Sequence, residues 1–66
     1  MAYIKKGDLL LVGERLWIAA SDDYTKRLSG TADYENDWRF VGAVNLLDPA
    51  TGAITWAMTS DVKKVS

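Results

Sequence analysis

The sequence predicts a mainly β domain, either a small five-stranded antiparallel curled sheet or a partly open barrel. Five glycines and one proline divide the 66 residues into short pieces, none of which is long enough for a core helix. The later pieces are rich in β-branched and aromatic residues, which is typical of strands. A chain of this length has room for only one core, so we expect residues 1–66 to form a single domain.

The first two strands are expected at residues 9–12 and 15–20. Between them lies Gly13-Glu14, where glycine can supply the positive φ of a two-residue hairpin turn. A bulge within one long strand is the alternative. The pattern favours the hairpin.

The polar segment from residue 21 to residue 37 begins with signals of a helix. Ser21 is a suitable N-cap, Lys26 and Arg27 lie near the expected end, and Gly30 follows. The sequence therefore predicts at most a short helical turn in residues 21–30, with a loop after it.

The most clearly marked element is a hairpin of residues 38–47 and 53–59. In the connection between them, Pro49 is placed for a type I turn and Gly52 for a left-handed position. After this hairpin, residues 60–62 predict a single 3₁₀ turn and residues 63–65 a short closing strand.

This layout is similar to that of small SH3-like or OB-like barrels. The ALYDY-type start of signalling SH3 domains is absent, and so is the aromatic strand signature of cold-shock proteins. No family's binding residues are therefore transferred to this chain.

Alternation along the hairpin predicts which side chains face the core. The expected core residues are Trp38, Phe40, Val44 and Leu46 on the first strand and Ile54, Trp56 and Met58 on the second. The opposite face is also largely apolar, with Val41, Ala43 and Ala57. Because the outer face of a monomeric antiparallel sheet is usually polar, this second face predicts self-association or docking on a protein partner. The alternative is that the long loop covers it.

An acidic, tyrosine-bearing loop is the second candidate for partner binding. Residues 21–37 have five acids and two bases. The candidate contact residues there are Tyr24, Asp33, Tyr34, Glu35 and Asp37. Aromatic side chains among charges are typical of recognition surfaces, and the acidic excess predicts a basic partner.

The alternating acids of this loop do not predict a calcium site. In an EF-hand that began at Asp33, the required Gly and Glu would be replaced by Trp38 and Val44. A solvated acidic loop is the better interpretation.

Four lysines near the two ends of the chain suggest an alternative function. If the terminal strands pair, Lys5, Lys6, Lys63 and Lys64 could form one basic patch for nucleic acid. The same lysines would also protect exposed sheet edges from aggregation. The net charge of −1 and the pI near 5.1 disfavour a nucleic-acid partner.

Composition removes most enzyme chemistry. The chain has no histidine and no cysteine, so it offers neither an imidazole base nor a thiolate nucleophile or metal ligand. We therefore expect a non-enzymatic protein-interaction module, such as an accessory, inhibitor or assembly protein of a bacterium or phage, without metal or cofactor. The absence of a signal-peptide pattern and of an apolar run of membrane length predicts a cytoplasmic protein without a membrane partner.

Overall fold

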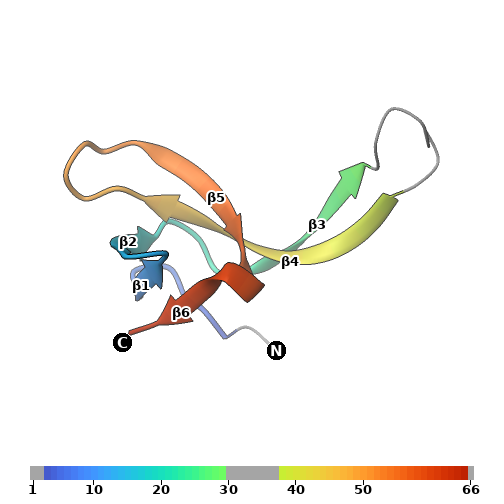
Figure 1. Cartoon of the computed structure of the whole chain (residues 1–66), viewed down its shortest axis with the longest axis horizontal. Coiled ribbons are helices and arrows are strands. Elements are labelled where there is room, and N and C mark those ends of the chain that lie inside the picture. Colours follow the sequence, from blue (N-terminus) through green and yellow to red (C-terminus); the bar gives the residue numbers. More distant parts are fainter. Residues whose placement is uncertain (1–2, 30–37, 66) are drawn as a thin grey trace.

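The computed structural model describes residues 3–29 and 38–65, which form a curled antiparallel sheet open along one side, a half-barrel (Figure 1). Among these residues the elements are β1 (Leu9–Val12), β2 (Arg15–Ala19), β3 (Tyr24–Ser29), β4 (Trp38–Leu47), β5 (Ile54–Met58), the 3₁₀ turn η1 (Thr59–Asp61) and β6 (Val62–Lys64). The strand order is β3-β4-β2-β1-β6, and β5 pairs with β4. The predicted mainly β fold is confirmed.

Both predicted hairpin turns are confirmed. Gly13 has a φ of 64°, and since Glu14 has no positive φ, the β1–β2 connection is of the II′ type. Gly52 has a φ of 77° in the β4–β5 connection. There the backbone N–H of Asp48 donates to the carbonyl of Ala53 (2.8 Å), which closes the loop.

The predicted helical turn in residues 21–30 is wrong, because Tyr24–Ser29 is strand β3. This strand pairs with β4 from Tyr24 opposite Ala43 to Ser29 opposite Trp38. The Ser21 hydroxyl does not cap a helix; it accepts a hydrogen bond from the Asn45 N–H (3.2 Å). Pairing with a ten-residue strand satisfies more backbone groups than one isolated helical turn could, so the long-range ladder overrides the local capping signals.

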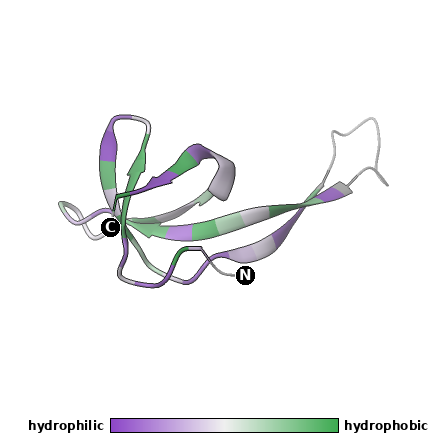
Figure 2. Cartoon of the chain, turned by 90° about the horizontal axis from the view of Figure 1, so that it is seen from below, coloured by the Kyte–Doolittle hydropathy of each residue, from purple (hydrophilic) through white to green (hydrophobic). Residues whose placement is uncertain are grey.

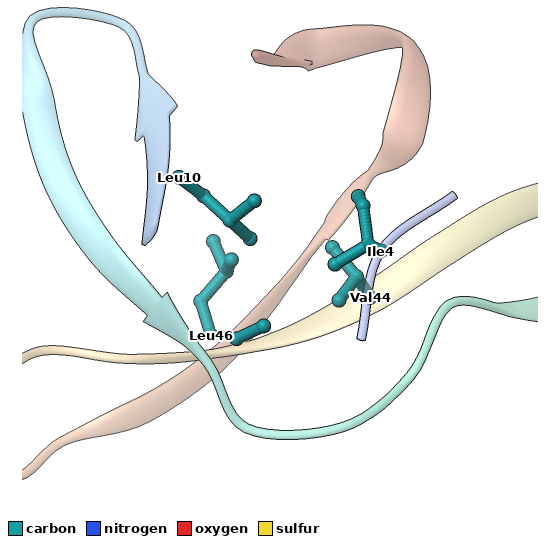
Figure 3. Packing of buried hydrophobic residues seen from close by; sticks show 5 residues of the cluster. Ile4, Leu10, Val44 and Leu46 are labelled. Carbon is teal, nitrogen blue, oxygen red and sulfur yellow. The ribbon is translucent and has the colours of Figure 1, made fainter. Parts of the chain in front are cut away.

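The core lies on the concave side of the sheet. Its largest fully buried side chains are those of Leu10, Val44 and Leu46, and Ile4 packs against them from the N-terminal segment (Figure 3). The Asp23 N–H donates to the Ile4 carbonyl (3.1 Å), which holds that segment in place. The concave side is called the core face below.

The prediction that Ile54, Trp56 and Met58 form the core side of β5 is wrong. Val44 is opposite Ala57 and Leu46 is opposite Thr55, and directly opposite residues share a face. The small residues of β5 therefore face the core. The inside of a curled sheet is narrow, so two large β4 side chains leave room only for small ones opposite.

One part of the sheet extends away from the rest. In Figures 1 and 2 strand β3 and the first half of β4 form a two-stranded arm, defined here as residues 24–29 and 38–42. Phe40 lies on the core-face side of this arm but is 61% exposed, since the arm runs past the core. The predicted core position of Phe40 is therefore wrong.

Candidate functional site

A row of four aliphatic side chains crosses the outer, convex face of the sheet. The pairing places Leu9 opposite Ile18 and Ile18 opposite Leu47. Leu47 in turn is opposite Ile54. Directly opposite residues share a face, and adjacent strands lie about 4.8 Å apart, so these side chains form one continuous row about 15 Å long.

Further apolar side chains widen this row into a patch. Leu11 is opposite Leu16 in the neighbouring row, and Trp56 lies two residues beyond Ile54 on the same face. The outer patch, as the term is used below, comprises Leu9, Leu11, Leu16, Ile18, Leu47, Ile54 and Trp56. Leu16 is 50% exposed, Ile54 66% and Trp56 38%. No element within residues 3–29 or 38–65 packs over this face.

Polar contacts border the outer patch on the side of the arm. The Tyr24 hydroxyl donates to Asn45 Oδ1 (2.6 Å) across the strand pair. The Lys26 ammonium lies 4.8 Å from the centroid of the Trp56 ring, a cation–π contact. These contacts orient Trp56 at the edge of the patch.

The predicted contact residues differ in the face of the sheet on which they lie and in their exposure. Val41 and Tyr24 lie on the outer face, but Ala43, on that face too, is fully buried between β3 and β5. Ala57 belongs to the core face. An apolar outer face therefore exists, with only Val41 and Tyr24 of these four partly exposed on it.

The sequence interpretation missed the contribution of the first hairpin. Leu9, Leu11, Leu16 and Ile18 were not assigned to the outer face. A signal was present, because a two-residue turn at Gly13-Glu14 fixes which side chains of the two strands are opposite each other. The predicted contact residues Asp33, Tyr34, Glu35 and Asp37 lie outside the described residues.

One of the four terminal lysines, Lys64, pairs its ammonium group with a carboxylate. Lys64 Nζ is 3.1 Å from Asp8 Oδ2, and the Lys5 N–H donates to the same carboxylate (2.9 Å). The Lys6 N–H donates to Asp22 Oδ1 (2.8 Å). Lys63 stands opposite Leu11 on β6, at the border of the outer patch. Asp8 therefore pairs with the charge of Lys64, whereas Asp22 binds the backbone of Lys6.

Two carboxylates stabilise loops through hydrogen bonds. The N–H of Lys5 and then the side chain of Lys64 hold the pKa of Asp8 below its ordinary value. The Ala50 N–H, and next the charge of Arg15, hold the pKa of Asp48 below its ordinary value despite the opposing effect of burial. Both groups are therefore ionised at neutral pH and accept the hydrogen bonds that close their loops.

A shallow depression of about 460 Å³ lies at the open end of the half-barrel. Its lining includes Tyr3, Ile4, Asp23 and Lys63. Within the described residues no three acidic side chains gather closely enough to hold a metal ion. The same residues include no helix that could cross a membrane.

Comparison with known proteins does not add a family to these observations. No protein-family model, characterised protein or solved structure matches the chain. The geometry of the outer patch is therefore the basis for the functional argument.

Proposed function

We propose that this chain is a non-enzymatic protein-interaction module that binds a protein through the outer patch. The observation that supports the proposal most directly is the aliphatic row of Leu9, Ile18, Leu47 and Ile54, which crosses four adjacent strands. Contiguous apolar surface that no other element covers is typical of interaction sites.

Two members of the outer patch expose apolar surface that a partner can bury. Leu16 and Ile54 are half to two-thirds exposed, and removing the remaining surface of each from water would stabilise a complex by about 1–2 kcal/mol. Trp56 would add a large aromatic surface at the rim, of the kind that is enriched where partners bind. Because association costs at least about 4 kcal/mol, the remaining members of the patch and the apolar surface of the partner must contribute as well.

The chemistry of the outer patch supports a protein partner over nucleic acid. All seven members are apolar and none can neutralise a phosphate. Of the lysines at the end of the sheet, Lys64 is paired with Asp8.

Site-specific photo-crosslinking in the native host tests the proposal. A photoreactive phenylalanine analogue at position 16 should give a protein adduct, because Leu16 is an exposed member of the outer patch. The same analogue at Tyr3, which is 80% exposed and outside the patch, is the matched control. Absence of an adduct from position 16, or equal adducts from both positions, would contradict the proposed function.

A further inference from the structure

Strand β5 has an open edge. Among the residues that the structure describes, β5 pairs with β4 alone, so no strand lies along its other side (Figure 1). An edge of this kind presents a row of backbone N–H and C=O groups to which another extended chain can bind.

The register of β4 and β5 shows which backbone groups lie on this edge. The Asp48 N–H donates to the Ala53 carbonyl (2.8 Å), so these two residues form a hydrogen-bonded pair. Hydrogen-bonded and non-hydrogen-bonded pairs alternate along an antiparallel ladder. Counting from that pair, the β5 residues whose N–H and C=O groups point away from β4 are Ile54, Trp56 and Met58.

The side chains on this edge belong to the outer face. Ile54 and Trp56 are members of the outer patch, and they are 66% and 38% exposed. In an added antiparallel strand, the residues that exchange hydrogen bonds with them would lie directly opposite and share their face. Aliphatic side chains at those alternate positions would extend the row of the outer patch by one strand.

No charge protects the open edge of β5. Edge strands commonly carry charged residues that prevent pairing with other chains. The other outer strands, β3 and β6, have such residues, namely Lys26 and Arg27 on β3 and Lys63 and Lys64 on β6. Strand β5 has no charged residue along Ile54–Met58, so its edge is suited to pairing.

The Trp56 side chain leaves this edge accessible. The Lys26 ammonium that contacts its ring (4.8 Å) comes from β3, and β4 lies between β3 and β5. The ring is therefore held on the β4 side, away from the open edge. If two copies of β5 paired along their full length, Trp56 would be opposite its symmetry mate, and the space between the two averted rings would be unfilled. A different chain can place aliphatic side chains there.

From these observations we infer that β5 binds an extended segment of a different protein as an additional antiparallel strand, and that this segment has aliphatic residues at alternate positions. The inference rests on the proposed function, whose partner it describes. Hydrogen bonds to the backbone of Ile54, Trp56 and Met58 supply affinity, and contact with the outer patch supplies the preference for aliphatic side chains.

Two isomeric synthetic peptides test the inference. Each has about nine residues, enough to span β5, with isoleucine or valine alternating with threonine and a lysine at either end for solubility. In the first peptide the threonine amides are N-methylated, which leaves the N–H groups of the aliphatic residues free to pair with β5. In the second the aliphatic residues are N-methylated instead. Calorimetry should show that the first peptide binds the full chain at least tenfold more tightly, because the second lacks several hydrogen-bond donors.

Two variants at the start of β5 test where the peptide binds. The N–H of Ile54 points away from β4, so Ile54→Pro removes a donor from the open edge without removing one from the ladder. Ile54→Ala is the matched control, since it also removes the aliphatic side chain but keeps the N–H. The proline variant should bind the first peptide about fivefold more weakly than the alanine variant.

Circular dichroism establishes that both variants are folded. Amide hydrogen exchange of the wild-type chain is a second measurement that needs no variant. Addition of the first peptide should slow exchange at Ile54, Trp56 and Met58, because their N–H groups then donate to the added strand.

Equal binding of the two peptides, or binding of neither, would overturn the inference. So would a wild-type chain with about twice the mass of 7.3 kDa in sedimentation equilibrium whose dimer is disrupted by Ile54→Pro and not by Ile54→Ala, since a second copy would then occupy the edge. In each of these cases a crosslink from position 16 to a different protein would leave the proposed function standing, whereas failure of that crosslink as well would remove both.

Discussion

Arg15 and Asp48 form an ion pair that joins the turn regions of the two hairpins. Arg15 is the first residue of β2, directly after the Gly13-Glu14 turn, and Asp48 begins the connection to β5. The Asp48 side chain is only 6% exposed and also accepts the Ala50 N–H (2.9 Å). The Arg15 guanidinium lies 4.8 Å from the Trp17 ring centroid. One carboxylate thus closes its own loop and connects it to the other hairpin.

Unfolding free energy should decrease in acid. The pKa values of Asp48 and Asp8 are lowered in the folded state, so each stabilises the fold above the unfolded aspartate pKa of about 3.9. This stabilisation is lost as the pH falls through the lower folded value. Urea titrations between pH 6 and pH 2 should show a decrease below about pH 4.

Asp48→Asn separates the charge of this residue from its role in the loop. The amide oxygen can still accept the Ala50 N–H, but the attraction to Arg15 is removed. The variant should be less stable at pH 7 and should show a shallower acid dependence than the wild type. Identical pH profiles for the two proteins would show that Asp48 does not stabilise the fold through its charge.

Gly42→Ala should destabilise the fold because of a close contact. A Cβ atom at position 42 would lie 2.5 Å from Thr59 Oγ1, well inside van der Waals contact. We expect a loss of about 1–2 kcal/mol of unfolding free energy. Chemical denaturation measures this value directly.

Thr59→Ala provides the matching control. It removes Oγ1, after which the nearest remaining atom at position 59 is 3.6 Å from the new Cβ, an ordinary contact. In the Thr59→Ala background, Gly42→Ala should therefore cost much less. An equal cost in both backgrounds would exclude the contact as the cause.

Leu46→Ala should destabilise the protein far more than Trp56→Ala. Leu46 is fully buried on the core face, and its truncation should cost about 2–5 kcal/mol, a large part of the stability of so small a domain. Trp56 is 38% exposed at the edge of the outer patch, so its truncation should chiefly weaken association. Thermal melts of dilute protein should show this order, and the reverse order would place Trp56 in the core.

The protein should not shift DNA or RNA in gel electrophoresis at low salt. The Lys64 ammonium is paired with Asp8, and none of the seven members of the outer patch is charged. A shift that disappears as salt is raised would instead support the alternative of nucleic-acid binding through Lys5, Lys6, Lys63 and Lys64. Asp8→Asn should then strengthen that shift.

Residues 21–30 show why local signals were insufficient. Ser21, Lys26 and Gly30 are spaced as they would be around a short helix, yet β3 occupies residues 24–29. The helical turn would have satisfied a few backbone groups, whereas β3 pairs with six residues of β4. That pairing depends on residues 9 to 19 positions away in the chain, which no local helix signal reveals.

The β class, both hairpin turns and the second apolar face could be predicted from the sequence, because glycine placement and strand alternation are local properties. The 3₁₀ turn and closing strand were also predicted within one residue. Which face of β5 is inside, and the joining of Leu9 and Ile18 with Leu47 and Ile54 in one row, became clear only from the folded sheet. Both depend on strand register and sheet curvature, which arise from contacts among distant segments. A strand with apolar residues on both faces can turn either face toward the core, and its pairing partners and the narrow space inside the curled sheet decide which face that is.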